Sequence, residues 1–135
     1  MIKTQLKRLS VMWFILSVAV AALFTGLMLS YAKVTELEGI AASEGIPVYY
    51  VSADAIESYV GQCANGFYDI DFNFIAVDGA QKLNARILAH ELGHYFAIKY
   101  YGDKSEEVAE RIGCELLRKS YTENLAASEA VFLIK

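Results

Sequence analysis

Both histidines of this 135-residue chain lie in one short motif, His90-Glu91-Leu92-Gly93-His94, of the form H-E-x-x-H. In a helix, His90 and His94 lie about 40° apart on one face, because each residue advances the helix by about 100°. Their imidazoles can then bind one Zn²⁺ from the same side, and Glu91 can reach the attacking water without binding the metal. The motif therefore predicts two zinc ligands and the general base of a hydrolase.

A catalytic zinc site needs a third protein ligand and an open position for water. The chain has no other histidine, so a carboxylate from the acidic segment after residue 102 is the natural donor. In the helix predicted over 106–119, Glu106 flanks the apolar stripe that faces the core, and Gly113 permits a close approach to the metal helix. We expect Glu106 to be the third ligand, with Glu110 as the alternative.

A long helix must carry the histidines. Asp78, with a glutamine three residues later, forms a capping-box pattern, which predicts that the helix begins there and ends near Tyr101. Apolar residues on both faces predict that the helix is buried. The small side chains of Ala89 and Gly93 leave one flank open to a close approach by another backbone.

Short strands should support this helix. Alternating apolar and polar residues over 67–77 predict one or two strands, and the β-prone run over 48–51 predicts another. Between them, Ser52 is expected to cap a helix over 53–63, and Asn65-Gly66 indicates a turn. The expected fold class is α+β, with a short β-sheet packed on the active-site helix. We expect the segment 72–77 to guide an extended substrate.

Residues Leu9–Tyr31 carry no charge and can cross a hydrocarbon core of about 30 Å. The chain thus divides into a basic tip (1–8), a transmembrane helix (9–31) and a domain (33–135), with a short helical or juxtamembrane segment over 35–44. The basic tip predicts a single-pass cell-membrane protein with a cytoplasmic N-terminus and the domain on the outer side. The alternative is a signal peptide cleaved before Lys33.

The charge distribution excludes one class of partner. The first eight residues contribute +3, whereas residues 33–135 hold 9 basic and 16 acidic residues, a formal charge of −7. A domain without a basic face is not expected to bind nucleic acid. The two cysteines, Cys63 and Cys114, are predicted to be isolated buried thiols, although they could pair in an oxidising compartment. The tail over 121–135 is predicted to be helical.

The segments 88–94 and 106–117 resemble zinc metallopeptidases of the gluzincin type, in which H-E-x-x-H precedes a helix carrying E-x-x-A-[ND]. The closest likeness is to the ImmA/IrrE family, whose pattern ends in E-x-E-A-N-x-F-A-x-x-L-L. This resemblance covers residues 66–117, including the strand before the metal helix. It implies that His90, His94 and Glu106 bind zinc and that Glu91 is the general base. This sequence departs in having Glu110 where Asn or Asp is usual.

Members of that family are mostly soluble cytoplasmic proteins that cleave regulatory proteins, and an external domain does not fit that substrate class. The sequence instead predicts a membrane-anchored zinc-dependent endopeptidase with a zincin-like domain and a protein or peptide substrate. One alternative is a non-catalytic zinc-binding module that holds a partner peptide, although the intact Glu91 favours the enzyme. A third interpretation is a small membrane interaction protein that binds no metal. It requires the H-E-x-x-H motif to have arisen by chance. Tyr68, Tyr95, Tyr100 and Tyr101 are candidate oxyanion donors, and none is preferred.

Overall fold

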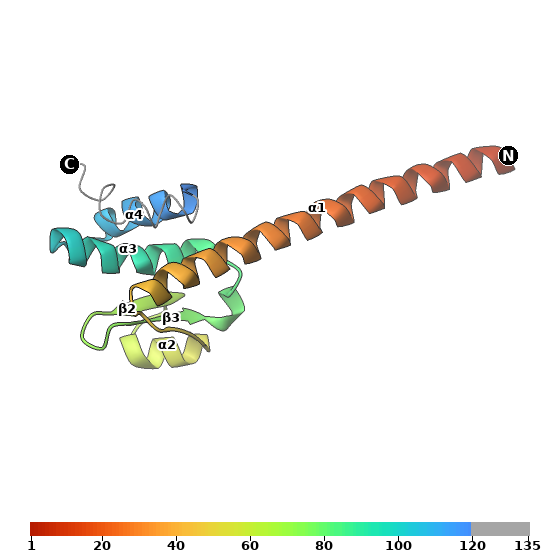
Figure 1. Cartoon of the computed structure of the whole chain (residues 1–135). Coiled ribbons are helices and arrows are strands. Elements are labelled where there is room, and N and C mark those ends of the chain that lie inside the picture. The colour runs from red at the N-terminus through yellow and green to blue at the C-terminus, as the bar shows by residue number, and fades with distance from the viewer. Residues whose placement is uncertain (120–135) are drawn as a thin grey trace.

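The computed structural model describes residues 1–119, and the helix predicted over 121–135 lies outside the described residues. In the described part, four α-helices and a three-stranded sheet form an α+β fold. The sheet lies on one side of α3, and α4 lies on the other (Figure 1). The expected α+β class is therefore confirmed.

Helix α1 (Ile2–Ser43) is a single unbroken helix of 42 residues, and its N-terminal part extends away from the rest of the molecule (Figure 1). By length and composition it could cross a membrane, since its most apolar 18-residue stretch has a mean hydropathy of 2.2 and none of it is buried. A signal sequence has the same properties. The segment 35–44 is not a separate element, because it continues this helix.

The sheet has the strand order β1-β3-β2. β1 (Val48–Val51) runs parallel to the central strand β3 (Phe74–Asp78), and β2 (Gly66–Asp69) runs antiparallel to it. As predicted, Ser52 caps the helix that follows β1, because its side chain accepts a hydrogen bond from the backbone N–H of Ala55.

The turn expected at Asn65-Gly66 lies directly before β2, where the chain bends at Asn65 and Gly66 already begins the strand. A second turn, between β2 and β3, includes Asn73 with a left-handed φ of 54°. One prediction about this sheet is wrong, because β3 is paired on both sides and the segment 72–77 therefore has no free edge for a substrate. In the described sheet β1 and β2 are the two edge strands, and each leaves one edge unpaired. The helix after Ser52, α2 (Ala53–Val60), is also shorter than predicted, because Gly61 ends it in a left-handed conformation.

The helix that carries both histidines, α3 (Ala85–Tyr101), begins later than predicted. Asp78 caps only a short 3₁₀ turn, η1 (Gly79–Gln81), by accepting from the backbone N–H of Ala80. The side chain of Asn84 then caps α3. Two polar caps therefore lie close together, and the second one starts the helix. At the other end Gly102 adopts φ 62°, which ends the helix where expected.

Helix α4 (Glu106–Arg118) packs against α3 with almost no space between the backbones. A Cβ atom added to Gly93 would lie 2.1 Å from the carbonyl oxygen of Ala109, and one added to Gly113 would lie 3.0 Å from that of Ala89. These pairs show that the two helices are antiparallel. The close approach expected at the small residues of α3 and at Gly113 is confirmed.

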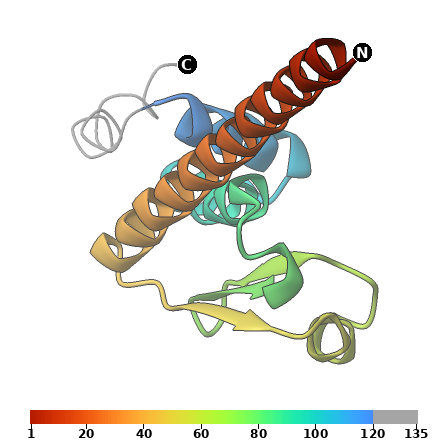
Figure 2. The same cartoon turned by 90° about the vertical axis from the view of Figure 1, so that its right-hand side faces the viewer.

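The core joins the end of α1 to the sheet and to both later helices. Figure 2 shows the same arrangement from another side, with the last turns of α1 alongside α3. The face of α3 that carries the histidines is only partly covered, since Tyr101 at its end is exposed. The largest fully buried side chains are Leu37, Ile56, Ile75, Val77, Leu88, Leu92, Phe96 and Leu116.

Both cysteines are free and exposed, so the prediction of buried thiols is wrong. Cys63 follows the end of α2, outside any strand or helix. Cys114 lies on the solvent side of α4, next to the buried residue Gly113. Neither position faces the core.

Candidate metal centre

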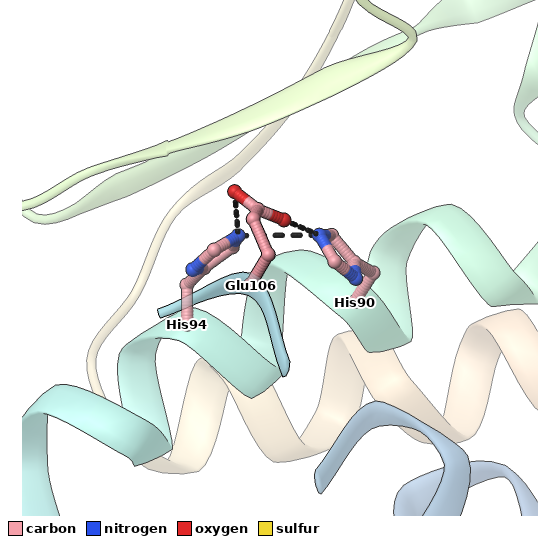
Figure 3. Close-up of side chains that lie close together, drawn as sticks. All are labelled: His90, His94 and Glu106. Carbon is pink, nitrogen blue, oxygen red and sulfur yellow. Dashed lines mark hydrogen bonds and ion pairs between the residues drawn. The ribbon is translucent and has the colours of Figure 1, made fainter. Parts of the chain in front are cut away.

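Helices α3 and α4 bring three donor side chains to one point, as Figure 3 shows. The Nε2 atoms of His90 and His94 are 3.2 Å apart, and the Glu106 carboxylate lies 3.0 Å from the first and 3.4 Å from the second. Four-coordinate Zn²⁺ with bonds of about 2.0–2.1 Å places its ligand atoms about 3.3 Å apart. The two imidazole nitrogens have about this separation, and one oxygen of the Glu106 carboxylate lies near each of them, so the three side chains form a group that could hold one metal ion.

The two ring nitrogens of His90 face different carboxylates. Its Nδ1 lies 2.9 Å from a carboxylate oxygen of Glu110. An ionised carboxylate only accepts hydrogen bonds, so this nitrogen carries the hydrogen. In the neutral ring Nε2 then holds a lone pair, which faces the carboxylate of Glu106. A metal ion held by both atoms would fit this arrangement, in which they lie 3.0 Å apart.

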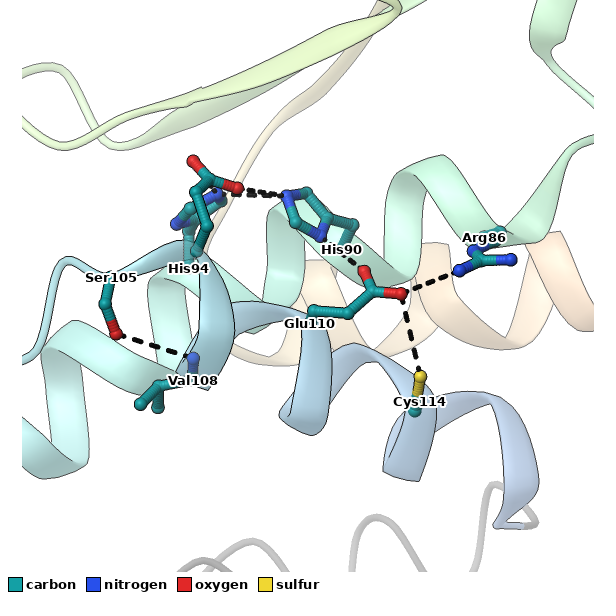
Figure 4. Close-up of polar contacts among 8 residues, drawn as sticks. Arg86, His90, His94, Ser105, Val108, Glu110 and Cys114 are labelled. Atoms are coloured by element: carbon teal, nitrogen blue, oxygen red, sulfur yellow. Dashed lines mark hydrogen bonds and ion pairs between the residues drawn. The ribbon is translucent and has the colours of Figure 1, made fainter.

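Glu110 is not a third ligand in this arrangement, because it binds the far side of the His90 ring (Figure 4). Its other oxygen accepts a hydrogen bond from Arg86 at 2.8 Å. The hydrogen bonds from Arg86 and His90 hold the pKa of Glu110 below its usual value. Such carboxylates fix the tautomer and orientation of metal-binding histidines. Between the two alternatives from the sequence, the geometry favours Glu106 as the ligand.

Ser105 positions Glu106, the candidate third ligand, at the start of α4. Its side chain accepts a hydrogen bond from the backbone N–H of Val108, which caps the helix and places Glu106 in the first turn. The Glu106 side chain is 79% exposed, whereas those of His90 and His94 are 25% and 17% exposed. The site is thus built on the buried helix α3 and closed from the solvent side by one carboxylate.

Glu91 is the only buried charged residue in the described part of the chain, with 7% of its surface exposed. Burial raises the pKa of its carboxyl group to about 7, and the nearby Glu106 carboxylate adds to the rise. The pKa of His94 shifts in the opposite direction. Burial lowers it and so favours the neutral ring, which is the form that binds metals. A divalent cation at the ligands would favour the ionised form of Glu91.

The three ligands and Glu91 open into a cleft of about 440 Å³. The edge strand β2 forms one wall, through Gly66, Phe67 and Tyr68, and Ile98 and Lys104 line the far end. A second hollow of about 340 Å³ reaches His90 and Glu91 from the side of Asn84 and Arg86. We call the point where the side chains of His90, His94 and Glu106 meet the metal point. It lies between these two hollows, and Gly66 of β2 lines both of them.

The candidate tyrosines are occupied elsewhere. The Tyr68 hydroxyl donates to the side chain of Asn73 at 3.0 Å, and the Tyr95 hydroxyl donates to Glu44 at 2.7 Å. Tyr68 still lines the cleft with its ring and backbone. Tyr100 stacks on Phe96, and Tyr101 is an exposed residue at the end of α3. No candidate oxyanion donor is assigned among them.

The structure brings together every predicted site residue: His90, Glu91, His94 and Glu106. Sequence reasoning missed the role of Glu110 as a partner of His90. The spacing could have indicated it, because Glu110 lies one helical turn after Glu106 on the same side of α4. Sequence reasoning also missed β2 as the cleft wall. Comparison of the chain with protein-family models, curated proteins and solved structures gives no match.

Proposed function

We propose that this protein is a membrane-anchored, zinc-dependent endopeptidase whose zincin-like domain cleaves protein or peptide substrates. The observation that carries the proposal is the convergence of His90, His94 and Glu106, whose donor atoms could hold one metal ion, beside the buried carboxylate of Glu91. A purely structural site needs no base and is normally closed by four protein ligands. Here three ligands face an open cleft.

The chain's own residues supply a hydrolytic mechanism. Zn²⁺ held by the three ligands would contribute Lewis acidity, to activate water and polarise the scissile carbonyl. Glu91 removes a proton from the attacking water and returns it to the leaving amine as the C–N bond breaks. The carbonyl carbon gains the hydroxyl group, so one water molecule is consumed for each bond cleaved. Glu110 keeps the His90 ring in place throughout.

The unpaired edge of β2 offers the place for an extended substrate. A peptide that adds to this edge forms backbone hydrogen bonds with the strand and passes over the metal point. Phe67 and Ile70 are among the residues that line the cleft along this path. This role was expected of 72–77, and we now assign it to the neighbouring strand.

The long apolar helix provides the membrane anchor in this proposal. The uncharged residues 9–31 would span the bilayer, residues 1–8 would remain in the cytoplasm, and the domain over 33–135 would lie on the outer side. The basic residues Lys3, Lys7 and Arg8 support this orientation, because positive residues near a span tend to stay in the cytoplasm.

The proposal is tested with the full-length protein, purified in a mild detergent after expression with added zinc. We expect one zinc ion per chain by elemental analysis and chelator-sensitive cleavage of a peptide library. Glu91→Gln should keep the zinc and lose cleavage by about 100-fold or more, because it removes the general base. The exposed Glu107→Gln serves as the matched control and should leave both unchanged.

Two results would contradict the proposal. A zinc-free protein would show that the three ligands do not form a metal site. Zinc binding without cleavage by the wild-type chain would instead support the non-catalytic peptide-binding module.

A further inference from the structure

The membrane helix and the domain are joined without a linker. The apolar stretch ends at Tyr31, and Val34, only 3% exposed, is already part of the domain core. Both residues belong to the same unbroken helix α1. The domain is therefore held at a fixed distance from the end of the apolar stretch.

Contacts at two levels show that α1 and α3 run side by side in the same direction. The Lys33 ammonium donates to the carbonyl oxygen of Lys119 at 2.6 Å, and α4 ends there, beside the start of α3. Eleven residues further along α1, Glu44 accepts a hydrogen bond from Tyr95, in the second half of α3. The start of α3 thus faces the membrane end of the domain.

The cleft follows the same direction. Gly66, at the start of β2, lies against Ile87 and Glu91, and the Tyr68 ring lies 5.8 Å from that of Tyr95. β2 therefore runs from the membrane end of the domain outward, with one hollow on each side of the metal point. A peptide extended along this strand has one end directed at the membrane.

The distance of the metal point from the end of the apolar stretch follows from the geometry of α1. The two contacts above place the level of His90 and His94 near residue 40 of α1, which is about nine residues beyond Tyr31. At about 1.5 Å per residue, the metal point lies about 13 Å beyond the apolar stretch. An extended chain covers this distance in about four residues.

We propose that the substrate is the juxtamembrane segment of another membrane-anchored protein, cleaved about four to eight residues from the bilayer on the domain's side. This inference rests on the proposed peptidase function and adds its substrate class. The anchor places the cleft just outside the headgroup layer, which extends about 5–8 Å beyond the hydrocarbon. Substrate and enzyme share the same two-dimensional surface, which raises the local concentration of this segment.

The test uses full-length protein in liposomes together with single-span reporter proteins. A sequence that the enzyme cleaves as a soluble peptide in detergent is placed 5, 15 and 30 residues from the end of the reporter's span. We expect the nearest site to be cleaved at least tenfold faster than the farthest one and than the soluble peptide added to the liposomes. Equal rates for all of them would overturn the inference while leaving the peptidase function intact.

A second variant tests the fixed height directly. Seven helix-forming residues inserted between Ala32 and Lys33 add two turns, which raise the cleft by about 10 Å and keep its orientation. The preferred cleavage position should move outward by about three residues. The same insertion between Lys3 and Thr4 is the control and should leave the position unchanged. An unchanged position in the first variant would contradict the inference, and absence of cleavage even in detergent would overturn both proposals.

Discussion

Glu110 approaches His90 from the side opposite the metal point, with its carboxylate oxygen 2.9 Å from Nδ1 of the ring. Two glutamates one helical turn apart on α4 thus contact opposite nitrogens of the same imidazole. In the proposed site, Glu106 would complete the ligand set, and Glu110 would fix which nitrogen of His90 carries the hydrogen. Their substitutions should therefore have different effects on metal binding.

We expect Glu106→Ala to remove the third ligand and to abolish stoichiometric zinc binding at micromolar zinc. Glu110→Gln should keep a stoichiometric site but weaken zinc affinity by about 10–100-fold, the usual effect of losing such a supporting carboxylate. Competition with a chromophoric chelator measures both affinities in the full-length protein. Identical losses for the two variants would argue against distinct roles.

The contact between α3 and α4 makes Gly93 essential for the fold. Gly93→Ala would place a methyl group 2.1 Å from the Ala109 carbonyl oxygen, so the helices must separate. We expect a loss of about 2–3 kcal/mol in the free energy of unfolding, at the upper end for overpacking. Thermal and urea unfolding in detergent measure this change. Gly79→Ala is the control, because its new methyl group would make only an ordinary contact of 3.5 Å.

The contact of Glu44 with Tyr95 and Lys99 ties the end of α1 to α3. Burial acts to raise the pKa of Glu44, but the hydrogen bonds from Lys99 and Tyr95 outweigh it and hold the pKa below its usual value. A carboxyl group with a lowered pKa stabilises the fold above its unfolded-state pKa, and this contribution is lost as the pH falls through the folded-state value.

Glu44→Gln should therefore reduce stability at pH 7 by about 0.5–1 kcal/mol, as expected for a pair that solvent partly screens. It should also flatten the loss of stability below about pH 4.5. Unfolding curves between pH 3 and pH 7 measure both effects. An equally steep acid loss in the variant would assign that loss to other carboxylates.

Both cysteines should react as free thiols in the folded protein, because Cys63 and Cys114 are exposed. A thiol reagent is expected to modify two groups per chain without prior denaturation or reduction. Cys63→Ser and Cys114→Ser should each remove one. If no thiol reacts until a reductant is added, the two residues are paired instead.

The sequence predicted the local features of the site well because they depend on spacing along single helices. The two histidines, Glu91 and Glu106 lie together as expected, and Gly102 ends α3 where the sequence predicts that this helix ends. The close approach at Gly93 was also predictable, since small residues permit it.

Features that depend on strand order were not predictable. The alternation over 67–77 indicates strands, but it does not tell which of them is central, and the parallel pairing of β1 with β3 comes from a distant segment. The substrate edge was therefore assigned to the wrong strand. The start of α3 was misplaced because Asp78 and Asn84 are both good caps, and only the packed structure shows which one begins the helix.

Because α1 is unbroken, the proposed membrane span and the domain that holds the cleft would move together as one rigid body. A transmembrane helix tilts by about 20° on average, and the tilt changes when the bilayer becomes thinner or thicker. Over a lever arm of about 13 Å, a tilt of this size would move the metal point sideways by about 4–5 Å but change its height by less than about 1 Å. The cleft would thus shift across the membrane surface when the bilayer becomes thinner or thicker, while its distance from the bilayer stays nearly constant.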